Sequence, residues 1–231
     1  GTTATASGTF LMPMMLGVVF GALISGQLLS RAGGHYRLQG AIGIAIMLTG
    51  MFLLSKMTSQ TSNATAIRNI VITGLGLGIT LPLFLIVVQN AVPHSVIGIA
   101  TSTNTFFRTI GGSLGLAIVG SIMNNSFLTS FNDNLSPQLA AAIPKEQLIA
   151  LTENPQALVN PDALAQLRVV FQGMGDQGEV LFNSLLDTLR EALSSGIGQV
   201  FFVSFLVLFI ALVLIVFIKQ IPLRKHNRET N

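Results

Sequence analysis

The sequence predicts an all-α protein that crosses a membrane five times. Of its 231 residues, 50% are hydrophobic and only 9% are charged, whereas a soluble domain carries about 25% charged residues. The mean hydropathy is +0.69. A helix needs about 20 mostly apolar residues to cross the bilayer core, and five stretches meet this length. They run approximately over residues 9–29, 38–54, 67–88, 97–123 and 197–218.

The first, third and fourth spans carry small residues at every fourth position. Such stripes let helix backbones approach closely, so these spans are expected at the centre of a bundle, with Gly111 and Gly115 at a close helix contact. Pro13 and Pro82 lie inside spans, where a proline removes a helical hydrogen bond. The glycines and prolines are compatible with tight packing alone and with hinging during a conformational cycle. The stripes consist of Gly17, Gly21 and Ser25, then Gly74 and Gly78, then Gly111 and Gly115.

The distribution of lysine and arginine predicts the orientation in the membrane. The hairpin after the first span carries Arg31 and Arg37, and the tail 219–231 is basic. Basic loops stay in the cytoplasm, and five spans place both segments on the same side. The sequence therefore predicts a multi-pass protein of the cell membrane. Its four-span unit 1–123 is followed by an extracytoplasmic segment 124–196, a last span 197–218 and a cytoplasmic tail.

The predicted external segment carries signals for short helices. Ser136 before Pro137 and Asn160 before Pro161 each look like an N-cap followed by proline at the first helical position. From Val180 an amphipathic helix is expected, because leucines recur every four residues on one face. A lid on the outer face of the spans and a dedicated binding module are both compatible with this pattern. The leucines are Leu181, Leu185, Leu189 and Leu193.

The last span differs from the others in composition. Its sequence, "VFFVSFLVLFIALVLIVFI", contains almost only large apolar residues, which is typical of a helix facing lipid. We expect it at the periphery of the bundle. The chain has no initiator methionine and no basic leader, and "GTTATASG" runs directly into a span. This beginning predicts the C-terminal piece of a longer polytopic protein.

Polar side chains gather where the third and fourth spans meet. Gln89 and Asn90 close the third span, and residues 101–105 ("TSTNT") open the fourth. Arg108 follows at membrane depth, where a charge is costly unless it is paired or hydrated. It either snorkels to the interface or lines a cavity with a direct role. The spans contain no aspartate or glutamate, so any ion-pair partner must come from outside these five helices.

Two quoted stretches resemble a known transporter family. "LMPMMLGVVFGALISGQLLSRAGGHYRLQGAIG" and "GLGLGITLPLFLIVVQNAVPHSVIGIATSTNTFFRTIGGSLGLAIVGSI" are similar to the C-terminal part of the EmrB/QacA-type exporters. These are the fourteen-span drug:proton antiporters of the major facilitator superfamily. The resemblance covers Phe10 to about Met123, and the last span by position only. It implies that the five stretches are the tenth to fourteenth spans of such a transporter.

The hairpin after the first span resembles the superfamily's cytoplasmic loop motif, G-x-L-x-D-R-x-G-R. Ser30 stands where the pattern has aspartate, and Gly34 where it has a basic residue. In the family, this motif is thought to latch neighbouring helices through the aspartate and the arginine. This hairpin is compatible with a latch that lacks the ion pair and with a plain basic turn. The matching residues are Gly26, Leu28, Arg31 and Gly33.

The resemblance implies export of bulky, amphipathic, often cationic compounds, driven by proton entry. The proton-coupling carboxylates would lie in the N-terminal half. No cofactor, metal or nucleic-acid partner is expected. The expected transport or conformational residues are Arg108, Gly111, Gly112, Gly115, Pro82, Gln89 and Asn90. Side chains that suit a hydrophobic cavity, or serve as ordinary packing, are Met12, Met15, Phe84, Asn104, Phe106 and Phe107.

Other functions remain in view at the level of the sequence. An exporter of a lipid, a siderophore or another metabolite would share this fold. A structural or channel-forming subunit would share the small-residue stripes, but would not require the prolines and the polar belt together. A membrane enzyme is disfavoured, because His35, His94 and His226 lie in the predicted loops and tail and no carboxylate lies in a span.

Overall fold

The computed structural model describes residues 4–31, 35–143, 165, 168–169, 171–173 and 175–218. Within these residues the chain is helical, and five helices are long and apolar enough to cross a membrane. This confirms the predicted fold class. The helices are α1 (Ala4–Arg31), α2 (Tyr36–Ser55), α3 (Asn63–Asn90), the 3₁₀ helix η1 (His94–Val96), α4 (Ile97–Asn134), α5 (Pro137–Ala142) and α8 (Asp176–Ile215).

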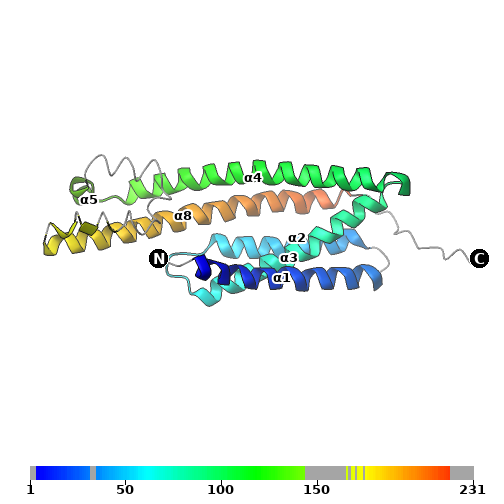
Figure 1. Cartoon of the computed structure of the whole chain (residues 1–231), viewed down its shortest axis with the longest axis horizontal. Coiled ribbons are helices and arrows are strands. Elements are labelled where there is room, and N and C mark those ends of the chain that lie inside the picture. The colour runs from blue at the N-terminus through cyan, green and yellow to red at the C-terminus, as the bar shows by residue number, and fades with distance from the viewer. Residues whose placement is uncertain are drawn as a thin grey trace, which may run out of the picture.

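The helices form two groups that lie side by side (Figure 1). In one group α3 packs between α1 and α2, which hardly touch each other. In the other group α4 and α8 run along each other, and α8 also packs against α2. Because α4 meets α3 only weakly, one long side of α4 has few neighbours within the described chain.

Helix α1 crosses α3 at backbone contact distance through glycines. A Cβ atom added to Gly17 would lie 2.6 Å from the Val71 carbonyl oxygen, and one added to Gly78 would overlap the Val18 carbonyl oxygen. Gly21 and Gly74 face carbonyl oxygens of the partner helix in the same way. Close approach through small residues is how membrane helices associate without a hydrophobic driving force. The predicted contact role of these two stripes is confirmed.

A buried polar cluster joins α1, α2 and α3. The Gln39 side-chain amide of α2 donates hydrogen bonds to the Ser25 carbonyl oxygen at 2.8 Å and to the Ser25 hydroxyl at 2.7 Å. The Ser25 hydroxyl in turn donates to the Ile79 carbonyl oxygen of α3 at 3.0 Å. Both side chains are buried, with Gln39 7% and Ser25 2% exposed. The cluster therefore fixes how the three helices sit against one another.

Replacing Gln39 with methionine is expected to lower the free energy of unfolding of the full-length protein by about 1–3 kcal/mol. The Ser25 hydroxyl then loses the donor that satisfies it inside a dry helix contact. Thermal unfolding in detergent measures the effect. Gln27→Met, on the exposed side of α1, is the matched control and should leave the melting temperature unchanged. Equal melting temperatures for both variants would contradict a stabilising cluster.

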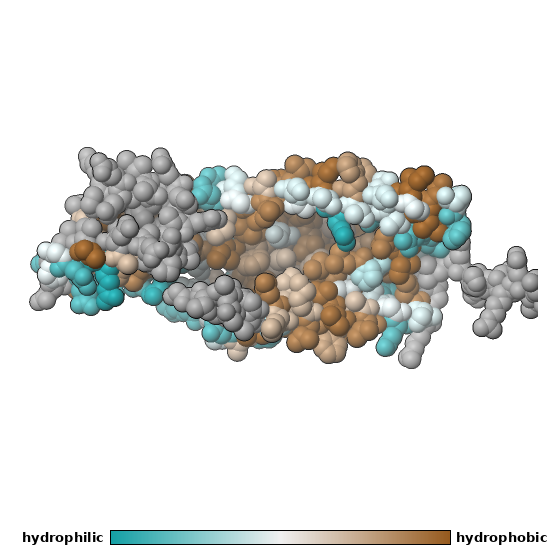
Figure 2. Space-filling view, in the orientation of Figure 1, coloured by the Kyte–Doolittle hydropathy of each residue, from teal (hydrophilic) through white to brown (hydrophobic). Residues whose placement is uncertain are grey.

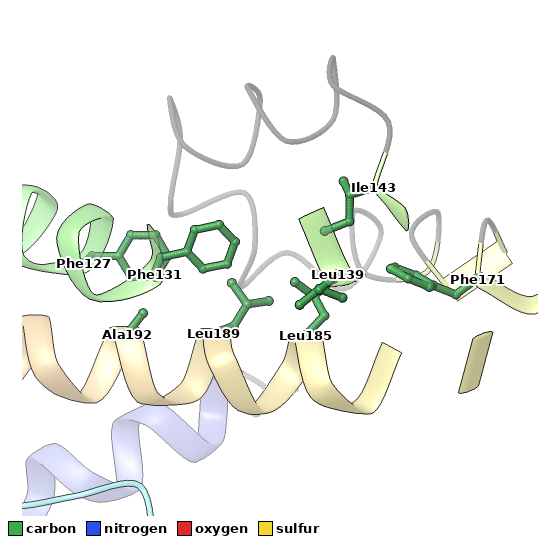
Figure 3. Packing of buried hydrophobic residues seen from close by; sticks show 8 residues of the cluster. All are labelled: Phe127, Phe131, Leu139, Ile143, Phe171, Leu185, Leu189 and Ala192. Carbon is green, nitrogen blue, oxygen red and sulfur yellow. The ribbon is translucent and has the colours of Figure 1, made fainter. Parts of the chain in front are cut away.

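The C-terminal end of α4 and the N-terminal end of α8 extend beyond their apolar parts and pack on each other (Figure 3). Phe127 and Phe131 stack with ring centroids 5.9 Å apart, and Leu185 and Leu189 of α8 are buried with them. Leu181 and Leu193 pack on the same cluster, which confirms the predicted leucine face.

The boundaries expected at residues 123 and 197 fall inside continuous helices. Each helix continues because its polar part still has an apolar stripe to bury. Ser136 caps α5 as predicted, since its hydroxyl accepts from the Leu139 amide at 3.2 Å. The N-cap expected at Asn160 lies outside the described residues.

The apolar part of α8 lies against α2 rather than standing alone at the periphery. Ile215 is buried with Ile44 and Leu48 of α2. The Arg37 guanidinium of α2 donates a hydrogen bond to the carbonyl oxygen of Val216, which is the C-cap residue of α8. The opposite face of α8 remains exposed at several large apolar residues, as expected for lipid contact. The contact of Arg37 also places the beginning of α2 and the end of α8 on one side of the bundle.

Single-cysteine labelling tests the predicted orientation of the bundle. The chain contains no cysteine. Asp133 is exposed near the end of α4, and Ser95 is exposed in η1, just before α4 begins. In intact cells a membrane-impermeant maleimide is expected to label Asp133→Cys but not Ser95→Cys. Permeabilisation should expose Ser95→Cys. The reverse pattern would place the α3–α4 turn outside the cell.

Candidate functional site

The predicted polar belt forms at the turn between α3 and α4. The Gln89 side-chain amide donates a hydrogen bond to the Thr101 hydroxyl at 3.0 Å, and both residues are half-buried. This bond turns one face of α4 toward α3. The expected meeting of the two polar stretches is thereby confirmed for Gln89 and Thr101. Asn90, beside them, also has an interaction partner.

Three hydroxyl groups in the first part of α4 donate hydrogen bonds within their own helix. Ser102 donates to the Gly98 carbonyl oxygen at 2.9 Å, Thr105 to the Thr101 carbonyl oxygen at 3.0 Å, and Thr109 to the Thr105 carbonyl oxygen at 3.0 Å. Such bonds to the carbonyl four residues earlier make a polar residue tolerable at membrane depth. These hydroxyls therefore need no partner from another helix.

Arg108 is not satisfied in this way by the backbone of its own helix. A guanidinium carries five donors and no acceptor, and within the described part of the chain it makes no hydrogen bond and no ion pair. Arg108 lies seven residues, about two helical turns, after Thr101. It therefore occupies the face of α4 that Thr101 presents to α3. Helix α3 diverges from α4 beyond the turn (Figure 1), and the Arg108 side chain is exposed.

The exposed face of α4 borders a hollow in the surface. Figure 2 shows the hollow between α4 and the group formed by α1, α2 and α3, with hydrophilic surface at its edge next to α4. Asn104 and the glycines Gly111, Gly112 and Gly115 share the face of Arg108 by helical spacing. We call this set, together with Thr101 and Arg108, the α4 stripe.

The close contact expected at Gly111 and Gly115 is wrong for the described chain. No neighbouring atom lies within 4 Å of the Cβ position at Gly111, Gly112 or Gly115. None of the residues in the most apolar window of α4 is buried. The physical reason is that α4 is held at its ends, by α3 at the Thr101 turn and by α8 near Phe127, while the stretch between faces the hollow.

The six side chains expected to line a cavity do not gather on one surface. Phe84 packs against the cluster between α2 and α8, which is the ordinary packing role that the sequence left open beside cavity lining. Phe106 precedes Arg108 by two residues and lies on the opposite side of α4, whereas Phe107 lies about a quarter turn from Arg108. Met12 and Met15 are exposed on α1. Of the six, Asn104 alone belongs to the α4 stripe.

The loop motif is described only in part. Ser30, in place of the motif's aspartate, donates to the Gln27 carbonyl oxygen of its own helix at 2.9 Å. Leu28 is exposed, and Gly26 has no atom within 4 Å of its Cβ position. Gly33 and the side chain of Arg31 lie outside the described part. Pro82 lies inside α3, which continues through it to Asn90.

Sequence reasoning missed Gln39, although the signal was present. It is the only amide side chain within the expected span 38–54, and a buried polar group in a membrane span needs a partner. The same argument that singled out Arg108 applies to it. Among the described residues, no cluster of histidine, aspartate and glutamate has the geometry to hold a metal ion.

Comparison with known proteins identifies the family. The family model described as "Major Facilitator Superfamily" matches residues 1–116, half of the chain. The chain belongs to the major facilitator superfamily. Membership in this superfamily indicates a membrane transporter rather than an enzyme. The match covers α1, α2, α3 and the part of α4 that carries the α4 stripe.

Individual members of the superfamily are similar over longer stretches. The "Multidrug transporter protein MdtP" of Bacillus subtilis is 28% identical over 239 residues, which cover 99% of this chain and 42% of that protein. The "Multidrug resistance protein 3" of the same organism is 30% identical over 217 residues, covering 94% and 39%. A "Tetracycline resistance determinant" of Streptomyces rimosus is 31% identical over 124 residues, covering 53% and 35%. The chain thus spans about two fifths of the length of the first two relatives. No solved structure matches the chain.

Proposed function

We propose that this chain is the C-terminal part of a secondary active transporter that exports amphipathic or cationic compounds in exchange for protons. The α4 stripe carries the proposal. It places a permanent charge, an amide and three glycines on one face of a spanning helix. The described chain leaves Arg108, Gly111 and Gly112 exposed on that face. Polar groups at this depth face a bundle interior or a water-filled cavity. The stripe therefore belongs at the interface with the remainder of the transporter.

The proposed mechanism is alternating access at that interface. Rigid halves rock against each other around a central site in transporters of this kind. The tight crossing of α1 with α3 and the Gln39 cluster make one group of helices into a single packed unit. The α4 stripe faces the other half, where its glycines allow close approach and Arg108 pairs with a group of that half in one state of the cycle.

Proton coupling in this proposal relies on groups outside the five helices. Coupling needs a titratable group at membrane depth, and the spans contain no aspartate or glutamate. The contribution of this chain is then conformational, through Arg108 and the belt formed by Gln89 and Thr101. The transporter is placed in the cell membrane with both Arg37 and the C-terminus in the cytoplasm. Similarity to a multidrug transporter, a multidrug resistance protein and a tetracycline resistance determinant supports drug export.

Transport by the full-length protein tests the proposal. Everted membrane vesicles are energised so that their interior becomes acidic, and tetraphenylphosphonium is added as a lipophilic cation. Protein-containing vesicles are expected to take up the cation and to lose part of the pH gradient, because protons leave as the cation enters. Vesicles without the protein should do neither. Uptake that persists after the pH gradient is collapsed would contradict proton coupling. Transport of a lipid or siderophore, without transport of any tested cation, would instead support a metabolite exporter.

A further inference from the structure

A second recess lies far from the α4 stripe, between the α2–α3 turn and α8. Its volume is about 770 Å³, and its walls are the turn residues 55–60 and one side of α8 from Glu191 to Phe202. No residue of α1 or α4 lines it. We call it the α2–α8 recess. Its position separates it from the hollow that the proposed transport function uses.

The α2–α8 recess sits at the level where a membrane span ends. Helix α2 is a 20-residue span that ends at Ser55, and the recess begins at that residue. A span of this length matches the hydrocarbon thickness, so the recess lies at the depth of lipid headgroups. Phe202 lines the recess and is 40% exposed. Phe52, which lies under Lys56 beside the recess, is 42% exposed. Both rings pack on Phe205, with centroids 6.3 and 5.6 Å away. These rings offer a surface for an acyl chain.

The walls of the recess are fixed by contacts of their own. The Thr58 amide donates to the Thr61 hydroxyl at 2.9 Å, which orders the turn. The Ser194 hydroxyl of α8 reaches the Met57 carbonyl oxygen at 3.5 Å. A Cβ atom added to Gly198 would lie 3.2 Å from the Ser55 carbonyl oxygen, so α8 approaches the end of α2 closely. The recess is therefore preformed, as ligand sites usually are.

Two opposite charges line the recess without neutralising each other. Lys56 lies over the Phe52 ring, with its Nζ atom 5.6 Å from the ring centroid. Glu191 lies across the recess on α8. In the part of the chain that the structure describes, neither side chain forms an ion pair. Ser195 and Gln199 add a hydroxyl and an amide on the same wall. The recess thus offers a cation and an anion to one ligand that carries both charges.

We propose that the α2–α8 recess binds the headgroup of a phosphoethanolamine lipid. The lipid phosphate pairs with Lys56, the primary ammonium pairs with Glu191 and the Ser195 hydroxyl, and an acyl chain follows Phe202. From Glu191 to Phe202 the helix rises about 16 Å, which accommodates a headgroup and the beginning of a chain. A choline headgroup has no N–H to donate to Glu191, and a glycerol headgroup brings no cation for it. Charge-assisted hydrogen bonds to both groups therefore select ethanolamine.

Native mass spectrometry of the full-length protein tests the proposal. The purified protein is mixed with phosphatidylethanolamine, phosphatidylcholine or phosphatidylglycerol of identical acyl chains. Phosphatidylethanolamine is expected to remain bound at about tenfold lower concentration than the other two, as the loss of one charge-assisted hydrogen bond implies. Free phosphoethanolamine should compete only weakly, because it lacks the chain that contacts Phe202. Equal retention of all three lipids would overturn the proposal, and so would full competition by the free headgroup.

Variants locate the binding in the recess. Lys56→Gln and Glu191→Gln are each expected to weaken phosphatidylethanolamine binding by about tenfold. Arg190→Gln and Glu179→Gln are the matched controls on α8. Arg190 pairs with Asp187 at 3.0 Å, and neither control residue lines the recess; both variants should bind like the parent. Parental binding by the two recess variants would overturn the proposal. Displacement of the lipid by tetraphenylphosphonium would assign the recess to a transported cation instead.

Discussion

Replacing Gly78 with alanine is expected to prevent stable folding of the full-length protein. The added Cβ atom would overlap the Val18 carbonyl oxygen. That atom is main chain, so no side chain can move aside, and α1 and α3 must separate along their whole contact. Overpacking of a well-packed contact costs about 1–3 kcal/mol and occasionally more. We expect at least the upper end of that range here, because Gly17, Gly21 and Gly74 lose their contacts together.

Size-exclusion chromatography and thermal unfolding in detergent measure the effect of Gly78→Ala. The variant is expected at low yield, with an aggregated or early-melting profile. Gly98→Ala is the matched control, since Gly98 is exposed on α4 and has no atom within 4 Å of its Cβ position. That control should express and melt like the parent. A Gly78→Ala protein that elutes and melts normally would show that α1 and α3 lie further apart than described.

The second large effect is expected for Arg108→Ala, which should abolish or uncouple transport at normal expression. In our proposal Arg108 pairs with a group of the other half in one state of the cycle. Losing a charge-assisted hydrogen bond of about 1.5–3 kcal/mol shifts the balance of states by roughly 10- to 100-fold. Arg108→Lys keeps the charge and should recover part of the activity. Direct contact with a cationic substrate is disfavoured, because like charges repel strongly in a low-dielectric cavity.

The tetraphenylphosphonium assay measures the effect of Arg108→Ala, and Arg68→Ala is the matched control. Arg68 lies near the start of α3, where its guanidinium bonds to the neighbouring Asn69 at 3.3 Å. Its replacement should leave transport near the parental rate. If Arg108→Ala transports like the parent, the arginine only snorkels to the interface. In that case the α4 stripe has no conformational role.

The five spans were predictable because hydropathy over 20 residues is a strong local signal. The contact faces of α1 and α3 were predictable as well, since glycines at every fourth position leave little choice of packing face. Which helix packs against each glycine stripe depends on the tertiary arrangement. Gly111 and Gly115 have the same spacing, but no helix of the described chain packs against them. The spacing rule identifies a surface suited to close contact. It does not say whether this chain supplies the contact.

Side-chain orientation was the harder part of the candidate site. Phe84, Phe106 and Phe107 have the chemistry of a hydrophobic cavity, but their directions depend on the rotation of α3 and α4. The bond between Gln89 and Thr101 sets that rotation for α4. It turns Arg108 toward the hollow, Phe106 to the opposite side and Phe107 about a quarter turn from Arg108. Helix ends were also harder to place than helices. Helices α4 and α8 continue past their apolar stretches because their additional turns bury apolar side chains in the cluster around Phe127 and Leu189.

The continuity of α4 makes it a lever. Its 38 residues, from Ile97 to Asn134, span about 57 Å at 1.5 Å per residue. A tilt of about 10° around its middle would displace each end by roughly 5 Å in opposite directions. The C-terminal end of α4 packs on α8 through the cluster that contains Phe131 and Leu185. The two helices would therefore move together. Any movement at the Arg108 level would then be transmitted to the C-terminal end, with no loop in between to absorb it.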